Sequence, residues 1–174
     1  MRSLSERTSS RYAIRAGAAA LTAALTTVLT GGVAAAGAAT DWASVVEPEL
    51  GCLEPRPGDD WYVVRARVAA TGDLTGDGRR ETVVVSSCPS PTSSNPLIAF
   101  VYDGAAKSPE PRLLGKLGEN RYFKSMKVTL GGGQVRLHGK VVSDRAPNCC
   151  PDLTVEQTYR WDRAKFRMTA ERTA

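Results

Sequence analysis

Apolar and polar residues alternate with a period of two along several stretches of the chain, a pattern typical of β-strands with one buried face. The first such stretch begins at Trp61, and its alternating apolar positions are Tyr62, Val64, Ala66, Val68 and Ala70. Arg65 and Arg67 point to its opposite face. The other alternating stretches lie at 122–130, 135–141 and 153–161, and a glycine run at 131–133 predicts a hairpin between the first two. These stretches predict strands paired in an antiparallel sheet.

Two further stretches, 82–88 and 97–102, are nearly continuous in β-branched, aromatic and other apolar residues. Such runs predict strands covered on both faces. Upstream, Asp41 is placed to cap a short helix over 41–46 that Pro48 limits. No convincing helical periodicity follows residue 48. We therefore predict a mainly β fold with a short N-terminal helix: an antiparallel sheet, sandwich or partly open barrel of about six to eight strands.

The first 39 residues have the features of a secretory signal peptide. Four arginines precede an uncharged stretch from Ala16 to Ala39 that ends in small residues, which predicts cleavage after one of residues 36–39. A retained membrane anchor is the alternative. The predicted organisation is a signal peptide at 1–39, an N-terminal arm at 40–60 and a β domain at 61–174.

Charge and composition exclude several classes of protein and of binding partner. At 42% apolar and 24% charged residues, the chain is neither disordered nor collagen-like. Removing residues 1–39 leaves 19 basic and 17 acidic residues, so the net charge falls from +5 to +2. Most of the basic character therefore belongs to the signal peptide, and a nucleic-acid partner is not expected. We expect a monomer that is secreted, either free or associated with the cell envelope, without stable membrane insertion after cleavage.

The remaining chain has four cysteines, Cys52, Cys88, Cys149 and Cys150, which predict two disulfides in an oxidising compartment. A bond between the neighbours Cys149 and Cys150 would close a strained ring, so we expect each to pair with Cys52 or Cys88. Which of the two pairs with which is left open by the sequence. A metal or redox site is the alternative, but the chain lacks C-x-x-C spacing and nearby histidine partners.

Residues 72–81, here called the aspartate loop, read GDLTGDGRRE. Oxygen donors fall at every second position, and a tight loop of this kind can supply most of the six to eight oxygen ligands that calcium takes. The predicted ligands are Asp73, Thr75, Asp77, the Arg79 carbonyl and Glu81, with Gly78 allowing the turn. Asp and Gly also build metal-free turns, so a bare turn remains the alternative.

The aspartate loop and the apolar strand after it, Thr82 to Ser86, resemble the aspartate-rich element of FG-GAP and VCBS repeats. Those repeats are extracellular β-propeller blades that bind calcium at such loops. This chain has one copy, and a propeller needs several, so the resemblance implies a blade-like hairpin at most.

A second resemblance covers residues 60–170. The loop, a valine-rich strand ending in Cys88, and a late segment with Asn148 to Pro151 and Tyr159 to Trp161 resemble small exported actinobacterial proteins of the LppP/LprE lipoprotein type. No cysteine follows the apolar stretch to accept a lipid, which favours a secreted form. The resemblance implies a secreted or envelope-associated domain and assigns no activity.

The sequence therefore predicts a secreted, non-enzymatic domain that binds an envelope component or a protein. Exposed cations at Arg65, Arg67, Arg136, Lys140 and Arg160 would form a basic face for anionic polymers if their strands are neighbours, and otherwise belong to separate solvated strand faces. A secreted hydrolase is one alternative, but the only histidine, His138, lies on a cationic strand face, and the adjacent Asp59 and Asp60 point apart. The other is a protease-inhibitor-like regulator that docks through the loop from Cys88 to Pro96.

Overall fold

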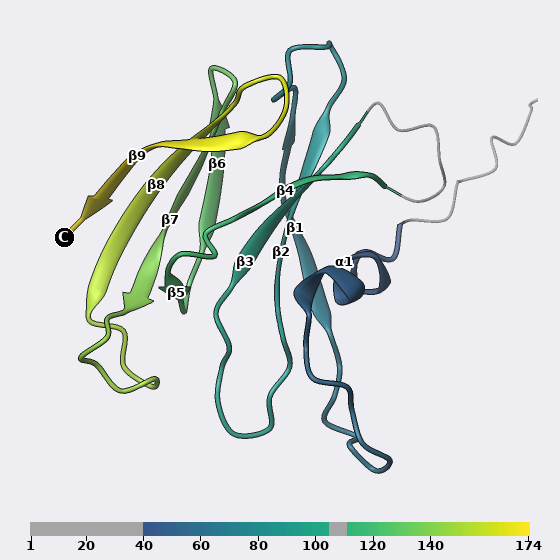
Figure 1. Cartoon of the computed structure of the whole chain (residues 1–174), viewed down its shortest axis with the longest axis vertical. Coiled ribbons are helices and arrows are strands. Elements are labelled where there is room, and N and C mark those ends of the chain that lie inside the picture. Colours follow the sequence, from purple (N-terminus) through teal and green to yellow (C-terminus); the bar gives the residue numbers. More distant parts are fainter. Residues whose placement is uncertain (1–39, 105–110) are drawn as a thin grey trace, which may run out of the picture. The chain divides into compact units, whose positions relative to one another are not determined.

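The computed structural model describes residues 40–104 and 111–174, which lie in one compact unit, Ala39–Ala174. The predicted signal peptide lies outside the described residues. Within them the chain forms one helix and nine strands arranged in two antiparallel sheets, without a closed barrel (Figure 1). The predicted mainly β class is confirmed, with one strand more than the upper end of the expected range.

Helix α1 spans Trp42–Leu50. Asp41 caps its N-terminus as predicted, because its carboxylate accepts hydrogen bonds from the Ala43 amide at 3.1 Å and from the Ser44 hydroxyl at 2.6 Å. The expected end near Val46 is wrong: Pro48 lies inside the helix, which continues to Leu50 and ends at Gly51 with a φ of 64°. Pro48 has no amide to donate to the Ser44 carbonyl and its ring crowds that group, but the added turn lets Leu50 pack against a sheet.

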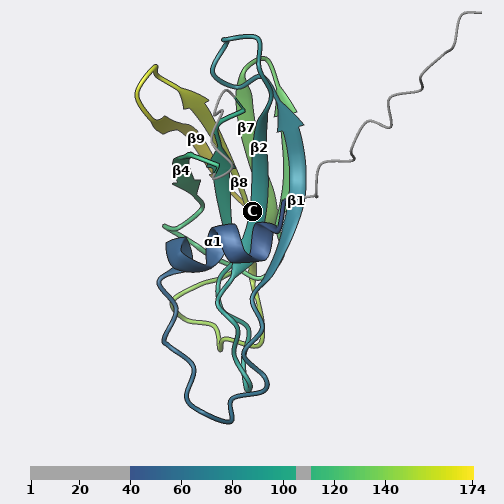
Figure 2. The same ribbon diagram turned by 90° about the vertical axis from the view of Figure 1, so that its right-hand side faces the viewer.

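Sheet A contains four strands in the order β1-β2-β3-β4. Its strands are β1 (Arg65–Gly72), β2 (Glu81–Ser87), β3 (Ile98–Tyr102) and β4 (Leu113–Leu117). Helix α1 runs across these strands on the outer side of the sheet (Figure 2). The side chains that meet there include Val46 from the helix and Val84, Phe100 and Tyr102 from β2 and β3, all at most 2% exposed. The expectation that β2 and β3 are covered on both faces is therefore confirmed.

Sheet B contains five strands in the order β5-β7-β8-β9, with β6 also paired to β7. Its strands are β5 (Tyr122–Phe123), β6 (Lys127–Gly131), β7 (Gln134–Val142), β8 (Leu153–Trp161) and β9 (Phe166–Thr173). Gly132 and Gly133 adopt positive φ values of 58° and 68° in the predicted hairpin between β6 and β7. The inner faces of the two sheets pack together in one core that includes Val83 and Val101 of sheet A and Leu137 and Val155 of sheet B.

Three local features differ from the sequence prediction. In β1 the register shifts between Val68 and Ala70. Val68 stays on the outer face with Val64 and Ala66 and is 43% exposed, whereas Ala70 turns to the inner core. Strand β4 has no counterpart among the predicted strands. The stretch 122–130 is divided into β5 and β6 because the amides of Lys124 and Ser125 both donate to the Lys140 carbonyl, which interrupts the regular pairing with β7.

Candidate functional site

The aspartate loop joins β1 to β2, and its carboxylates are hydrogen-bonded to its own backbone. Asp73 accepts hydrogen bonds from the Gly76 amide at 2.7 Å and the Gly78 amide at 3.0 Å, and Asp77 accepts one from the Arg79 amide at 2.8 Å. Gly76 and Gly78 have positive φ values of 81° and 82°, so the predicted turn at Gly78 is confirmed.

Glu81 is fully buried at the start of β2. Its carboxylate accepts hydrogen bonds from the amides of Leu74, at 2.5 Å, and Thr75, at 3.1 Å. The Thr75 hydroxyl donates to the other carboxylate oxygen at 3.4 Å. Glu81 therefore joins the two ends of the loop, a structural role that the sequence did not suggest.

The oxygen donors of the loop suit calcium, but amide hydrogens already face the carboxylates of Asp73, Asp77 and Glu81. In the part of the chain that the structure describes, no group of three or more His, Cys, Asp and Glu side chains is arranged to hold a metal ion. The five calcium ligands stay a prediction, and the shape of the loop is maintained by hydrogen bonds.

The expected disulfide pairing is wrong. Cys52 pairs with Cys88, their Cα atoms 5.4 Å apart, and Cys149 pairs with its neighbour Cys150. Cys52 follows α1 and Cys88 follows β2, so both belong to sheet A and its covering helix. Cys149 and Cys150 lie in the exposed loop between β7 and β8 of sheet B. The sequence-based elimination of the neighbouring pair failed because it could not show that the two halves of the chain form separate sheets.

The outer face of sheet B gathers most of the predicted cations. Residues directly opposite each other in an antiparallel pair share a face, and the pairs Arg136–Thr158, Gln134–Arg160 and Arg160–Arg167 link β7, β8 and β9. We call these cations the basic face: Lys127, Arg136, Lys140, Arg160, Arg167 and Arg172. Glu156 is the one carboxylate at the outward positions of β6 to β9.

Two of the predicted cations lie elsewhere. Arg65 and Arg67 are on β1 in sheet A, and the Arg67 guanidinium donates a hydrogen bond to the Met126 carbonyl at 3.1 Å. Three cations of the face were missed: Lys127, Arg167 and Arg172. Lys127 follows the same alternation as its neighbours, so the pattern of 122–130 could have included it, whereas Arg167 and Arg172 required the register of β9.

Most of the basic face is free of ion pairs. Arg167 forms one with Asp162, and this hydrogen bond, followed by those from the Lys165 and Ala164 amides, lowers the pKa of Asp162 to about 2. Among the described residues, Lys127, Arg136, Arg160 and Arg172 have no carboxylate partner within ion-pair distance. Their positive charge is therefore available to an external anion.

The candidate catalytic residues do not form a constellation. His138 lies on the outer face of β7 with Arg136 and Lys140, as predicted, between Lys127 and Glu156 in the neighbouring strands. Asp59 accepts hydrogen bonds from the Arg56 amide at 2.8 Å and the Trp61 indole at 3.0 Å, so its carboxylate shapes its own segment.

Comparison with known proteins adds no family. No family model, curated protein or solved structure matches this chain. Among the described residues, no helix combines the length and apolar character needed to cross a membrane. The resemblances to FG-GAP and VCBS repeats and to the LppP/LprE type therefore stay predictions.

Proposed function

We propose that this chain is a secreted, non-enzymatic domain that binds an anionic polymer of the cell envelope through the basic face of sheet B. The observation that carries the proposal is the excess of cations on that face, where six basic side chains accompany the single carboxylate of Glu156. The domain has a small net charge, so this excess reflects how charge is distributed over the surface and not the overall composition.

The spacing of these cations suits an extended polyanion. Adjacent strands lie about 5 Å apart, and alternate residues along a strand lie about 7 Å apart. Cations placed on such a grid can contact successive charges of one polymer chain, and the summed field attracts it from a distance.

The chemistry favours phosphate or carboxylate groups over nucleic-acid bases. No Phe, Tyr or Trp side chain stands among the cations at the outward positions of β6 to β9, where the one ring is the imidazole of His138. Trp161 at the end of β8 and Phe166 at the start of β9 pack against each other, with ring centroids 5.1 Å apart. They are paired next to the outward pair Arg160–Arg167 and therefore point to the inner side of the sheet. Stacking with bases on this face is therefore limited to the imidazole of His138.

Export is part of the proposal. It is supported by the arginine-led N-terminal segment and by the Cys52–Cys88 disulfide, which persists in oxidising compartments. Determining the N-terminus of the protein recovered outside the producing cells tests it: we expect the first residue to fall within 37–40.

The binding test compares two double variants with the same change in net charge. Arg136→Glu with Arg160→Glu reverses charge on the basic face, and Arg56→Glu with Arg65→Glu reverses it elsewhere. With long-chain inorganic polyphosphate as the probe, we expect the first variant to bind about tenfold weaker or more, and the control to stay within about threefold of wild type. Binding of the wild type should weaken steeply with salt.

Equal losses in both variants would show that net charge is responsible and not the face. Failure of the wild type to bind polyphosphate and polyglutamate at low salt would refute the proposal.

A further inference from the structure

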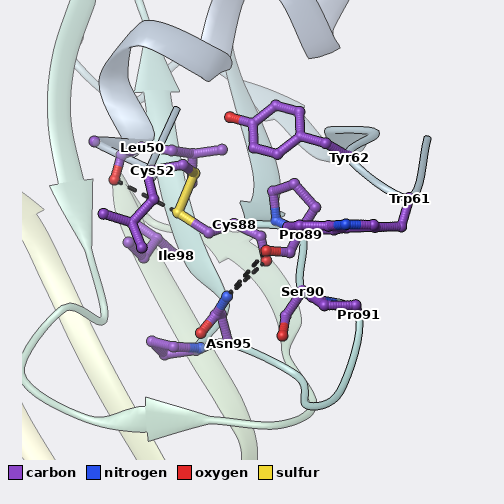
Figure 3. A pocket seen from close by; sticks show the side chains of 13 residues that line it. Leu50, Cys52, Trp61, Tyr62, Cys88, Pro89, Ser90, Pro91, Asn95 and Ile98 are labelled. Carbon is purple, nitrogen blue, oxygen red and sulfur yellow. Dashed lines mark hydrogen bonds between the residues drawn. A yellow bond between two sulfur atoms is a disulfide. The ribbon is translucent and has the colours of Figure 1, made fainter. Parts of the chain in front are cut away.

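A pocket of about 460 Å³ lies between the end of α1, the segment 51–62 and the loop that joins β2 to β3 (Figure 3). Its lining is mostly apolar and aromatic, and includes Leu50, Trp61, Tyr62, Pro89, Pro96 and Ile98. The volume falls within the range of small-molecule sites, and such sites usually combine apolar walls with a few polar groups. We call it the aromatic pocket; it lies on the sheet A side and shares no lining residue with the basic face.

The walls of the aromatic pocket are held in place by covalent and hydrogen bonds. The Cys52–Cys88 disulfide forms part of the lining (Figure 3). The Asn95 side chain donates to the Cys88 carbonyl at 3.1 Å and to the Pro89 carbonyl at 3.3 Å, which fixes the loop after β2. A pocket that is formed before binding loses little conformational freedom when a ligand enters.

Two adjacent rings line one side of the pocket. Trp61 and Tyr62 meet edge to face, with centroids 5.9 Å apart, and Trp61 is 42% exposed. The Trp61 indole nitrogen already donates to Asp59 at 3.0 Å, so its one polar group is occupied. What Trp61 offers a ligand is its π surface, which attracts cations.

Three carboxylates stand close to these rings. Asp59 accepts the hydrogen bond from the Trp61 indole. Glu47 and Glu54 lie near Tyr62, and they raise the pKa of its hydroxyl in addition to the larger effect of partial burial. Among the described residues, none of these three carboxylates has a lysine or arginine within ion-pair distance. Residues 47–62, which run beside the pocket, carry five acidic residues and one basic residue, Arg56, so the net charge here is opposite in sign to that of the basic face.

We infer that the aromatic pocket binds a small quaternary ammonium compound. The negative surroundings and the π surfaces select a cation. No charged side chain belongs to the lining itself, so a primary ammonium or guanidinium group would enter without a carboxylate to accept its N–H donors. A quaternary ammonium has no N–H to satisfy, and its methyl groups suit the proline and leucine walls.

Calorimetric titration of the disulfide-intact protein with choline tests this inference. We expect saturable binding at one site, and binding about threefold to thirtyfold weaker for 3,3-dimethyl-1-butanol, the neutral carbon isostere of choline. Equal affinity for the neutral isostere would reduce the site to a plain apolar pocket and overturn the inference. So would tighter binding of propylammonium, or no saturable binding of choline up to tens of millimolar.

Variants locate the site. Trp61→Leu keeps an apolar side chain but removes the π surface, and should weaken choline binding by about threefold to thirtyfold while leaving the neutral isostere unaffected. Asp59→Asn keeps an acceptor for the indole and removes one charge, so it should weaken choline alone; Asp144→Asn, in the exposed loop after β7, is the charge-matched control and should not.

Unchanged choline binding in both Trp61→Leu and Asp59→Asn would overturn the assignment to this pocket. Polyphosphate binding should be the same in Trp61→Leu and wild type, so the two proposals fail or stand separately. The urea midpoint of each variant confirms that it is folded.

Discussion

The inner faces of both sheets are apolar, but the outer face of sheet A is apolar as well, whereas the outer face of sheet B is charged. Outside sheet A, Val84, Phe100 and Tyr102 are buried beneath α1. Outside sheet B, the corresponding positions of β7 carry Arg136 and Lys140, which are exposed. The outer face of sheet A is covered by a nine-residue helix and forms a second hydrophobic cluster. The outer face of sheet B has no such cover and is charged.

This difference explains why the strands have different sequence patterns. The strands β2 and β3 are apolar on both sides because each side meets another layer of the protein. The strand β7 alternates strictly because water covers its outer side. A continuous apolar run thus indicates a covering element elsewhere in the chain, and an alternating run indicates a free face that can serve binding.

The largest expected effect comes from truncating the side chain at the centre of the covered face. Phe100 is fully buried under α1, so Phe100→Ala should lower the free energy of unfolding by about 3–5 kcal/mol. Thr158→Ala on the outer face of sheet B is the control and should change it by less than about 0.5 kcal/mol. Urea denaturation measures both, and similar losses would contradict the contrast between the faces.

The next effect concerns the covalent bond between the helix and its sheet. Replacing Cys52 and Cys88 together by serine should cost about 2–4 kcal/mol, because their bond joins residues 36 positions apart. The same change at Cys149 and Cys150 should cost less than about 1 kcal/mol, since it closes almost no loop. Peptide mapping under non-reducing conditions checks the pairing directly. A disulfide-linked pair of peptides that joins Cys88 to Cys149 or Cys150 would contradict it.

A third test concerns the aspartate loop at the edge of sheet A. If calcium binds there, a concentration of 100 times the Kd would stabilise the fold by about 2.7 kcal/mol and raise the Tm by several degrees. The Asp77→Ala variant should lose that shift. Coincident melts of the wild type in calcium and in excess chelator would leave the loop as a turn held by Asp73, Asp77 and Glu81.

The smallest effect concerns a polar network on the inner side of sheet B. Glu171 accepts hydrogen bonds from Arg121 and from the buried Gln157, and these bonds, in that order, lower its pKa from 4.5 to about 2. A carboxyl whose folded pKa is depressed contributes stability above its unfolded pKa and loses it as pH falls towards the folded value.

Glu171→Gln should therefore cost about 1–3 kcal/mol at pH 7, and the difference from wild type should shrink between pH 4.5 and pH 2. Unfolding free energies measured across this range provide the check. A difference that stays constant with pH would show that the ion pair with Arg121 is not responsible.

Much of the fold was predictable because it depends on local patterns. The Asp41 cap, the glycine hairpin before Gln134 and the inward face of 135–141 each follow from residues close together in the chain. Strand β4 was missed because it is short and does not alternate in burial; its pairing with β3 defines it. The shift in β1 was missed because a bulge is visible only against a partner strand.

The candidate sites were predictable only in part. Arg136, Lys140 and Arg160 were expected to share a basic face with Arg65 and Arg67 if their strands were neighbours. The strand pairing places only the first three together and adds Arg167 and Arg172 from β9. The aromatic pocket gave no sequence signal, because its walls come from the end of α1, the segment 51–62 and the loop after Cys88.

The sequence by itself determined most of the secondary structure and the orientation of most strand side chains, because alternation and capping act between neighbours in the chain. The tertiary structure decided which cysteines pair, which cations share a face and where a pocket opens. Those properties depend on contacts between residues far apart in sequence, such as Cys52 with Cys88, and their free energies are realised only when the two sheets and the helix assemble.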